Sequence, residues 1–86
     1  MGESLAPTYP LTLTVSKGGP GWPQVAQNPA TLAHLLLLAW QARFRVHGLV
    51  DASGAPQDWR TPMRAAVRAH YSAEMYAAME RRGAVP

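Results

Sequence analysis

The sequence contains no cysteine and few charged residues. Without cysteine, no disulfide can cross-link the fold, and no thiolate can act as a nucleophile or a metal ligand. Charged residues make up 15% of the 86 positions, well below the roughly one quarter that is usual in globular domains, whereas 48% are apolar. We expect one domain spanning residues 1–86 with too little chain for a large core, and we expect a partner to cover part of its apolar surface.

A long hydrophobic run and a targeting segment are both missing. The strongest apolar run, from Leu35 to Trp40, is far shorter than the ~18 residues that a membrane helix requires. The first residues lack the basic stretch that precedes the apolar core of a signal peptide. We therefore expect a cytoplasmic protein that does not bind a membrane.

Groups that carry catalysis are also sparse. The three histidines, His34, His47 and His70, show no i, i+4 pair that would suit a helical metal site. Asp51 and Asp58 flank a loop, where turn and capping roles explain them, and no serine has the surroundings of a nucleophile elbow. We expect no catalytic residue, no metal and no cofactor in this chain, so that it is not an enzyme on its own.

The basic residues lie in the second half of the chain. Seven arginines and four carboxylates follow Ala42, and they account for the whole net charge of +3. Arg60, Arg64 and Arg68 are spaced by about one helical turn. This spacing suits contacts with phosphates or with the carboxylates of a protein partner. A small nucleic-acid-binding protein that uses these three arginines is therefore one alternative.

The first 28 residues predict an extended arm. Four prolines and the cluster Gly18-Gly19-Pro20-Gly21 exclude a long helix there. Leu11, Leu13 and Val15 alternate with polar residues, which predicts one short strand over about residues 10–16. We expect this strand to pair with another chain or with a copy of itself, or to lie over the helices; the sequence leaves open whether it pairs in cis or in trans.

Residues 29–86 predict two helices. Asn28 and Pro29 mark the start of a helix over about 29–47 that ends before Gly48, and Thr61 and Pro62 start a second one over about 62–82. The 13-residue connection is too long for a helix-turn-helix motif. The predicted fold is mainly α: an antiparallel helical hairpin with an extended N-terminal arm.

The apolar faces of these helices predict a binding surface. The apolar arc of the first helix is wider than one neighbour can cover, and Tyr71, Met75 and Met79 form a stripe at four-residue spacing on the second. The tryptophans Trp22, Trp40 and Trp59 are expected to tie arm, helix and loop together; a platform for nucleic-acid bases would need them clustered with basic residues. The leading hypothesis is a non-catalytic helical subunit or adaptor that docks into a larger protein assembly, as a homo- or hetero-oligomer. The predicted interface residues are Leu11, Leu13, Val15, Trp22, Leu35, Leu38, Tyr71, Met75 and Met79.

Several short motifs resemble the N-terminal half of a nitrile hydratase β subunit. They are the glycine-containing segment 16–21, Gly48-Leu49, Trp59 followed by residues 63–67, and the segment 68–78 with His70-Tyr71. The resemblance implies a β-type or accessory subunit of a metalloenzyme whose iron or cobalt lies on a partner chain. It also implies that Arg64 contacts oxidised cysteine ligands of that partner.

Overall fold

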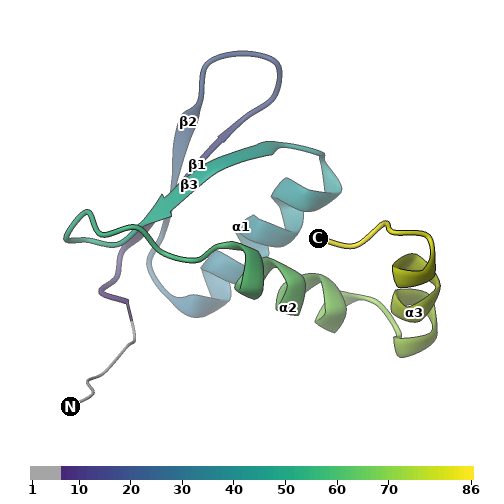
Figure 1. The fold of residues 1–86 in the computed structure, drawn as a ribbon. Coiled ribbons are helices and arrows are strands. Elements are labelled where there is room, and N and C mark those ends of the chain that lie inside the picture. Colours follow the sequence, from purple (N-terminus) through teal and green to yellow (C-terminus); the bar gives the residue numbers. More distant parts are fainter. Residues whose placement is uncertain (1–6) are drawn as a thin grey trace.

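The computed structural model describes residues 7–86, which form a three-stranded antiparallel sheet and three helices (Figure 1). In chain order these elements are β1 (Leu11–Ser16), β2 (Trp22–Ala26), α1 (Pro29–Gln41), β3 (Arg45–Val50), α2 (Arg60–His70) and α3 (Ala73–Arg81). The strand order in the sheet is β2-β1-β3. The prediction of a mainly α helical hairpin with an extended arm is therefore wrong, because part of the arm and the end of the first predicted helix form a sheet.

The predicted strand is present, but its partners lie within the same chain. β1 pairs with β2 through a hairpin, and it pairs with β3 on its other side. The glycine cluster makes the five-residue hairpin connection, where Gly18 has a φ of +74°, a conformation that favours glycine. Residues 7–28 are therefore a hairpin rather than an arm; the first six residues of the predicted arm lie outside the described part of the chain.

The start of α1 is confirmed and its end is not. The Asn28 side-chain oxygen accepts a hydrogen bond from the Thr31 N–H at 2.8 Å, and Pro29 occupies the first turn, where no N–H is required. The helix ends at Gln41, about one and a half turns before the predicted end at residue 47. The chain then leaves the helix through Arg43 and becomes β3.

The end of the first predicted helix instead belongs to β3, which contains a β-bulge. Thr14 lies opposite Gly48 and Val15 lies opposite Val46, so His47 is an extra residue in β3. The bulge brings Val46 and Leu49 to the same side of the sheet although they are three residues apart. The bulge therefore interrupts the alternation of side chains along β3.

The second predicted helix is divided into α2 and α3. It begins at Arg60 rather than at residue 62, because the Asp58 carboxylate accepts a hydrogen bond from the Arg60 N–H at 2.9 Å. It breaks at Tyr71, whose backbone is extended, and the Ser72 hydroxyl accepts a hydrogen bond from the Met75 N–H to start α3. Ser72 followed by Glu74 in the first turn is the local signal for this new start.

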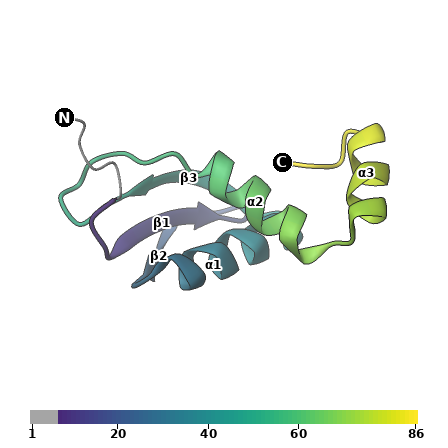
Figure 2. The same cartoon turned by 90° about the horizontal axis from the view of Figure 1, so that it is seen from below.

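The core lies between the sheet and the helices. α1 and α2 pack against each other, and Figure 2 shows α3 beyond the end of the sheet. β2 and β3 are both antiparallel to β1 and hence parallel to each other, and α1 connects them. The buried apolar side chains form one cluster: Leu11, Leu13, Val15, Ala26, Leu32, Leu36, Ala39, Leu49, Met63, Val67, Tyr76 and Met79. Across residues 7–86, no helix is long and apolar enough to cross a membrane.

Candidate functional site

A cleft of about 870 Å³ opens between the C-terminal end of α1, the start of β3, α2 and α3. This volume lies within the roughly 300–1,000 Å³ that is usual for ligand sites. We call it the arginine cleft. It is lined by Trp40, Gln41, Arg43, Phe44, Val46, Trp59, Arg60, Met63, Tyr71, Met79, Arg82, Ala84 and Pro86.

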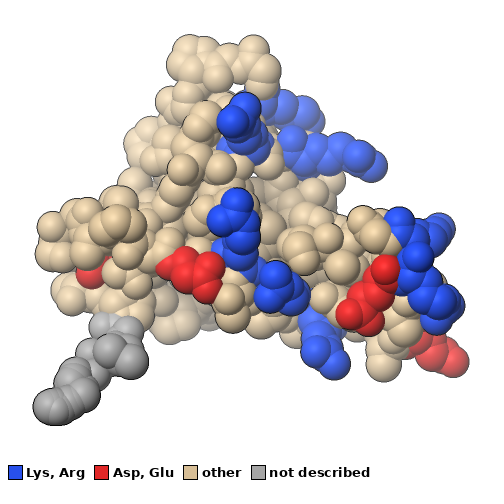
Figure 3. Space-filling model, viewed as in Figure 1, with Lys and Arg blue, Asp and Glu red and all other residues tan. Residues whose placement is uncertain are grey.

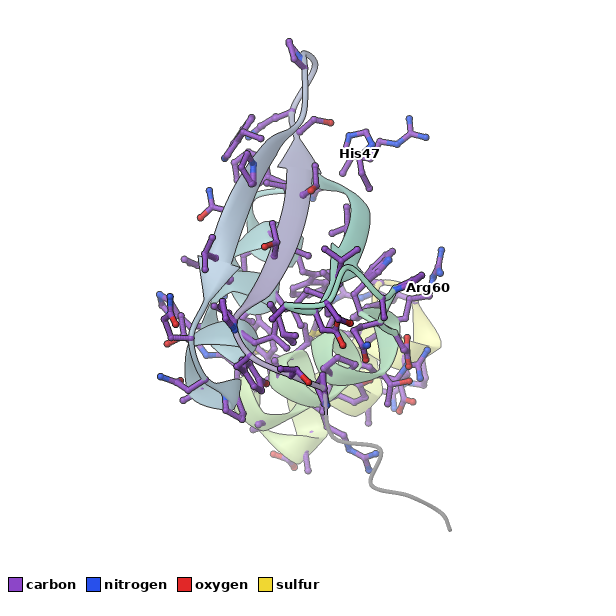
Figure 4. The ribbon with its side chains drawn as sticks, turned by 90° about the vertical axis from the view of Figure 1, so that its left-hand side faces the viewer. His47 and Arg60 are labelled. Carbon is purple, nitrogen blue, oxygen red and sulfur yellow. The ribbon has the colours of Figure 1, made fainter. Side chains whose placement is uncertain are left out.

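Three arginines from three separate parts of the chain meet at this cleft. Arg43 follows α1, Arg60 begins α2 and Arg82 caps α3. Figure 3 shows basic atoms over these parts of the molecule, and Figure 4 shows Arg60 and His47 on the same side of it. None of the lining residues is acidic. The side chains of the lining therefore contribute three positive charges and no negative charge, although the chain as a whole carries only +3.

Four aromatic side chains line the same cleft. The rings of Trp40 and Tyr71 pack edge to face with their centroids 6.0 Å apart, and Gln41 donates to the Tyr71 hydroxyl at 3.5 Å. The Arg60 guanidinium lies 4.5 Å from the centroid of the Trp59 ring, a cation–π contact that holds the arginine at the cleft wall. Phe44 and the side chains of Met63 and Met79 add apolar surface. The aromatic and methionine side chains of the lining are buried or half-buried and the three arginines are exposed, so apolar groups form the floor of the cleft and cationic groups its rim.

The backbone of Arg43 is in the left-handed region, with a φ of +62°. It occupies the position after the helix cap where glycine is usual, since the Phe44 N–H donates to the Ala39 carbonyl at 2.8 Å and the Arg43 N–H donates to the Trp40 carbonyl at 3.2 Å. The same arrangement ends α3, and there the residue is Gly83, with a φ of +69°. For a residue other than glycine this backbone conformation is unfavourable by about 1–2 kcal/mol. The chain therefore places an arginine at the cleft where a glycine would be more stable.

Of the three arginines predicted to bind a ligand, only Arg60 lines the cleft. Arg64 donates from Nε to the main-chain oxygen of Pro86 at 3.4 Å, and the Arg68 guanidinium lies 5.7 Å from the centroid of the Tyr76 ring. These two side chains contact the chain's own C-terminal segment and α3. All three arginines lie on α2, but Arg64 and Arg68 make their contacts within the chain and do not line the cleft.

The predicted interface residues divide into three groups. Leu11, Leu13 and Val15 are buried in the core, facing α1, and Leu35 is partly buried against it. Tyr71 and Met79 line the arginine cleft, whereas Trp22, Leu38 and Met75 are exposed to solvent. Sequence reasoning did not identify Arg43, Arg82, Trp40 or Trp59 as site residues. No local spacing joins them, because they meet only when α1, β3 and α3 are packed.

A serine and a histidine form a polar pair on the sheet face opposite the helices. Ser16 Oγ and His47 Nε2 are 2.7 Å apart, and Ser16 is buried. The bulge at His47 directs this imidazole to Ser16 on the neighbouring strand. Within residues 7–86 no carboxylate bonds to the other imidazole nitrogen, so the pair lacks the group that orients a catalytic histidine. We interpret it as a structural pair that satisfies the serine hydroxyl.

Two carboxylates in the loop before α2 have lowered pKa values. Hydrogen bonds from the Ser53 side chain and the Ala55 N–H hold the pKa of Asp51 below its usual value. A hydrogen bond from the Thr61 side chain, with further ones from backbone N–H groups, lowers the pKa of Asp58. Both groups organise the loop and the start of α2, as the sequence predicted for turn and capping residues. In the described residues, no three His, Asp or Glu side chains are grouped to hold a metal ion.

No protein-family model matches this chain, and no curated protein or solved structure is significantly similar to it.

Proposed function

We propose that this chain is a non-catalytic binding protein whose arginine cleft takes an acidic, partly apolar segment of a partner protein. The observation that carries the proposal is the meeting of Arg43, Arg60 and Arg82 around a floor of aromatic and methionine side chains. The proposal keeps the adaptor role expected from the sequence. It moves the docking site from the predicted arm and helix face to the cleft.

The composition of the lining favours a peptide. Tryptophan, tyrosine, methionine and arginine are the residues enriched at protein interfaces, and methionine adapts its shape to a partner's side chains. Guanidinium groups bind carboxylates with two parallel hydrogen bonds, which suits Glu or Asp side chains at the rim.

The conformation of Arg43 gives independent support. A backbone held in an unfavourable conformation at a ligand site is a reason to infer that its side chain has a role. The closely similar turn at Gly83 shows that the helix ending itself does not need a side chain at this position. We infer that the guanidinium of Arg43 is retained for binding.

The test is the affinity of a fluorescent peptide of about 15 residues, with Leu and Phe at the i, i+3, i+4, i+7 positions and Glu elsewhere. Its matched control carries Lys in place of Glu. We expect the Glu peptide to bind and the Lys peptide not to bind. Arg82→Gln should weaken binding about 10- to 150-fold, because a hydrogen bond to a charged group contributes roughly 1.5–3 kcal/mol.

The neighbouring Arg81 provides a matched variant on the chain itself. It is exposed on α3 and does not line the cleft. Arg81→Gln makes the same change in net charge one residue away, so we expect less than about a twofold effect on affinity. Equal effects at the two positions would mean that only overall charge matters, and would contradict the proposed site.

Single-stranded nucleic acid is the second candidate. Trp40 and Trp59 lie at one cleft together with three arginines, which is the clustering that stacking of bases requires. However, the Arg60 guanidinium already lies over the Trp59 ring, which leaves less of that ring for a base. An oligothymidylate that binds more tightly than the Glu peptide, and loses affinity in Arg82→Gln but not in Arg81→Gln, would favour nucleic acid over peptide.

A further inference from the structure

The two edges of the sheet are covered to different extents. Beside β3, Val50 forms an antiparallel bridge with Pro56, and the Gln57 N–H donates to the Leu49 carbonyl at 2.7 Å. β2 is the other edge strand, and on its outer side no strand of the described chain pairs with it. An uncovered edge offers backbone groups to another strand.

The register of the hairpin shows which backbone groups of β2 face outward. Pro23 lies opposite Thr14 and has no N–H, so this pair cannot exchange hydrogen bonds with β1. The hydrogen-bonded pairs are therefore the neighbouring ones, which include Gln24 with Leu13. Consequently the Pro23 carbonyl and both the N–H and the carbonyl of Val25 point away from the sheet.

Apolar side chains accompany this edge. Val25 is 51% exposed and Trp22 is 38% exposed, and Leu38 on the adjacent α1 is 44% exposed. An apolar groove of about 120 Å³ lies between β2 and α1 and is lined in part by Trp22 and Leu38. We call the outward side of β2 together with these three side chains the β2 edge.

The β2 edge carries no charge. Residues 18–42, which include all of β2 and α1, contain no Lys, Arg, Asp or Glu. Edge strands of monomeric proteins are usually protected by charged side chains, lysine in particular. Here Pro23 is the one protective residue, and it leaves Val25 able to pair.

We propose that the β2 edge pairs with the β2 edge of a second copy of this chain, in an antiparallel register centred on Val25. Two copies that each carry +3 repel each other least where neither has charge, and this argues for a second copy rather than a charged partner. In this register the two Val25 residues face each other across a two-fold axis and exchange two N–H to carbonyl hydrogen bonds. The two sheets join into one of six strands, with Val25 on the face away from α1 and Trp22 on the face toward it.

The first test is the mass of the full chain in solution by light scattering. We expect the mass to rise with concentration from 9.3 kDa toward twice that value. Val25→Lys places two like charges opposite each other and should give a monomer at every concentration, whereas Val25→Thr keeps a β-branched residue and should remain a dimer. A wild-type chain that stays monomeric would overturn the proposal, as would a Val25→Lys dimer.

The absence of cysteine permits a second test that does not depend on the folding of the lysine variant. Across a hydrogen-bonded pair the Cα atoms are about 5.5 Å apart, a separation that a disulfide accepts. We expect Val25→Cys to form a covalent dimer under mild oxidation. Ala65→Cys, at an exposed position of α2, should cross-link at least about tenfold more slowly, because random collision is its only route. Equal cross-linking rates for the two variants would overturn the proposed contact.

Discussion

Replacing Arg43 by glycine should stabilise the fold, although it removes a side chain from the cleft. The residue has a φ of +62°, which is unfavourable for any side chain by about 1–2 kcal/mol and is readily adopted by glycine. Glycine also makes the unfolded chain more flexible, which offsets about 0.4–1 kcal/mol of this gain. The net increase in the free energy of unfolding should be about 0.5–1 kcal/mol, which raises Tm by about 3–6 °C for a domain of this size.

Two further variants separate the backbone from the charge. Arg43→Ala removes the guanidinium, and with it any repulsion from Arg60 and Arg82. It keeps a residue with a side chain in the left-handed backbone conformation. Its stability should stay within about 0.5 kcal/mol of the wild type. Gly83→Ala is the reverse change in the equivalent turn. A Cβ atom there meets no other atom within 4 Å, so the expected loss of about 1 kcal/mol is conformational only.

The assay is urea unfolding followed by circular dichroism, with Tm as a second measure. The reasoning predicts the order Arg43→Gly, then wild type and Arg43→Ala together, then Gly83→Ala. If Arg43→Gly were no more stable than Arg43→Ala, the arginine would not be held in a strained backbone. The inference that binding retains it would then lose its support.

Three other predictions concern the described contacts. Ser72→Ala removes the cap of α3 and should lower stability by about 1 kcal/mol, with faster amide hydrogen exchange in residues 73–81 as the readout. Leu36→Ala empties a site with 0% exposure and should lower the free energy of unfolding by about 2–5 kcal/mol in urea titrations; a smaller loss would show that the core closes around the cavity. Asp51→Asn should lower Tm at neutral pH. The pKa of Asp51 is lower in the folded chain than its value of 3.8 in the unfolded chain, so the ionised carboxylate stabilises the fold at pH values above 3.8. That stabilisation is lost as the pH falls through the folded pKa, so the Tm difference should disappear in acid; a difference that is constant with pH would contradict this assignment.

The local signals in the sequence were reliable where a few adjacent residues decide the structure. Asn28 followed by Pro29 starts α1, and alternation from Leu11 to Val15 gives β1. Both depend on contacts within one turn or one pleat, and no distant part of the chain alters them. Ser72 before Glu74 was a similar signal for the start of α3, but the uninterrupted pattern of alanine and methionine concealed it.

Other errors came from features that only pairing creates. The bulge at His47 interrupts the alternation of β3, and Arg43 occupies a helix ending where glycine is the recognisable signal. The hairpin between β1 and β2 was missed because prolines mark both its connection and its edge strand. Pro23 is tolerated there only because its missing N–H is not required by β1, a condition that depends on register.

The sequence by itself determined the small size and the uneven distribution of charge, because composition decides these. It also determined the start of α1 and the strand β1, because short-range hydrogen bonds and side-chain alternation decide them. It also set the uncharged segment 18–42, which contains the edge strand β2 and the helix α1. Only the tertiary structure decided that Arg43, Arg60 and Arg82 share one cleft with Trp40 and Trp59. These residues are up to 42 positions apart, and they meet through the packing of α1 on α2 and the break before α3. Convergence over such distances depends on which buried surfaces fit together, and periodicity along the chain does not encode that.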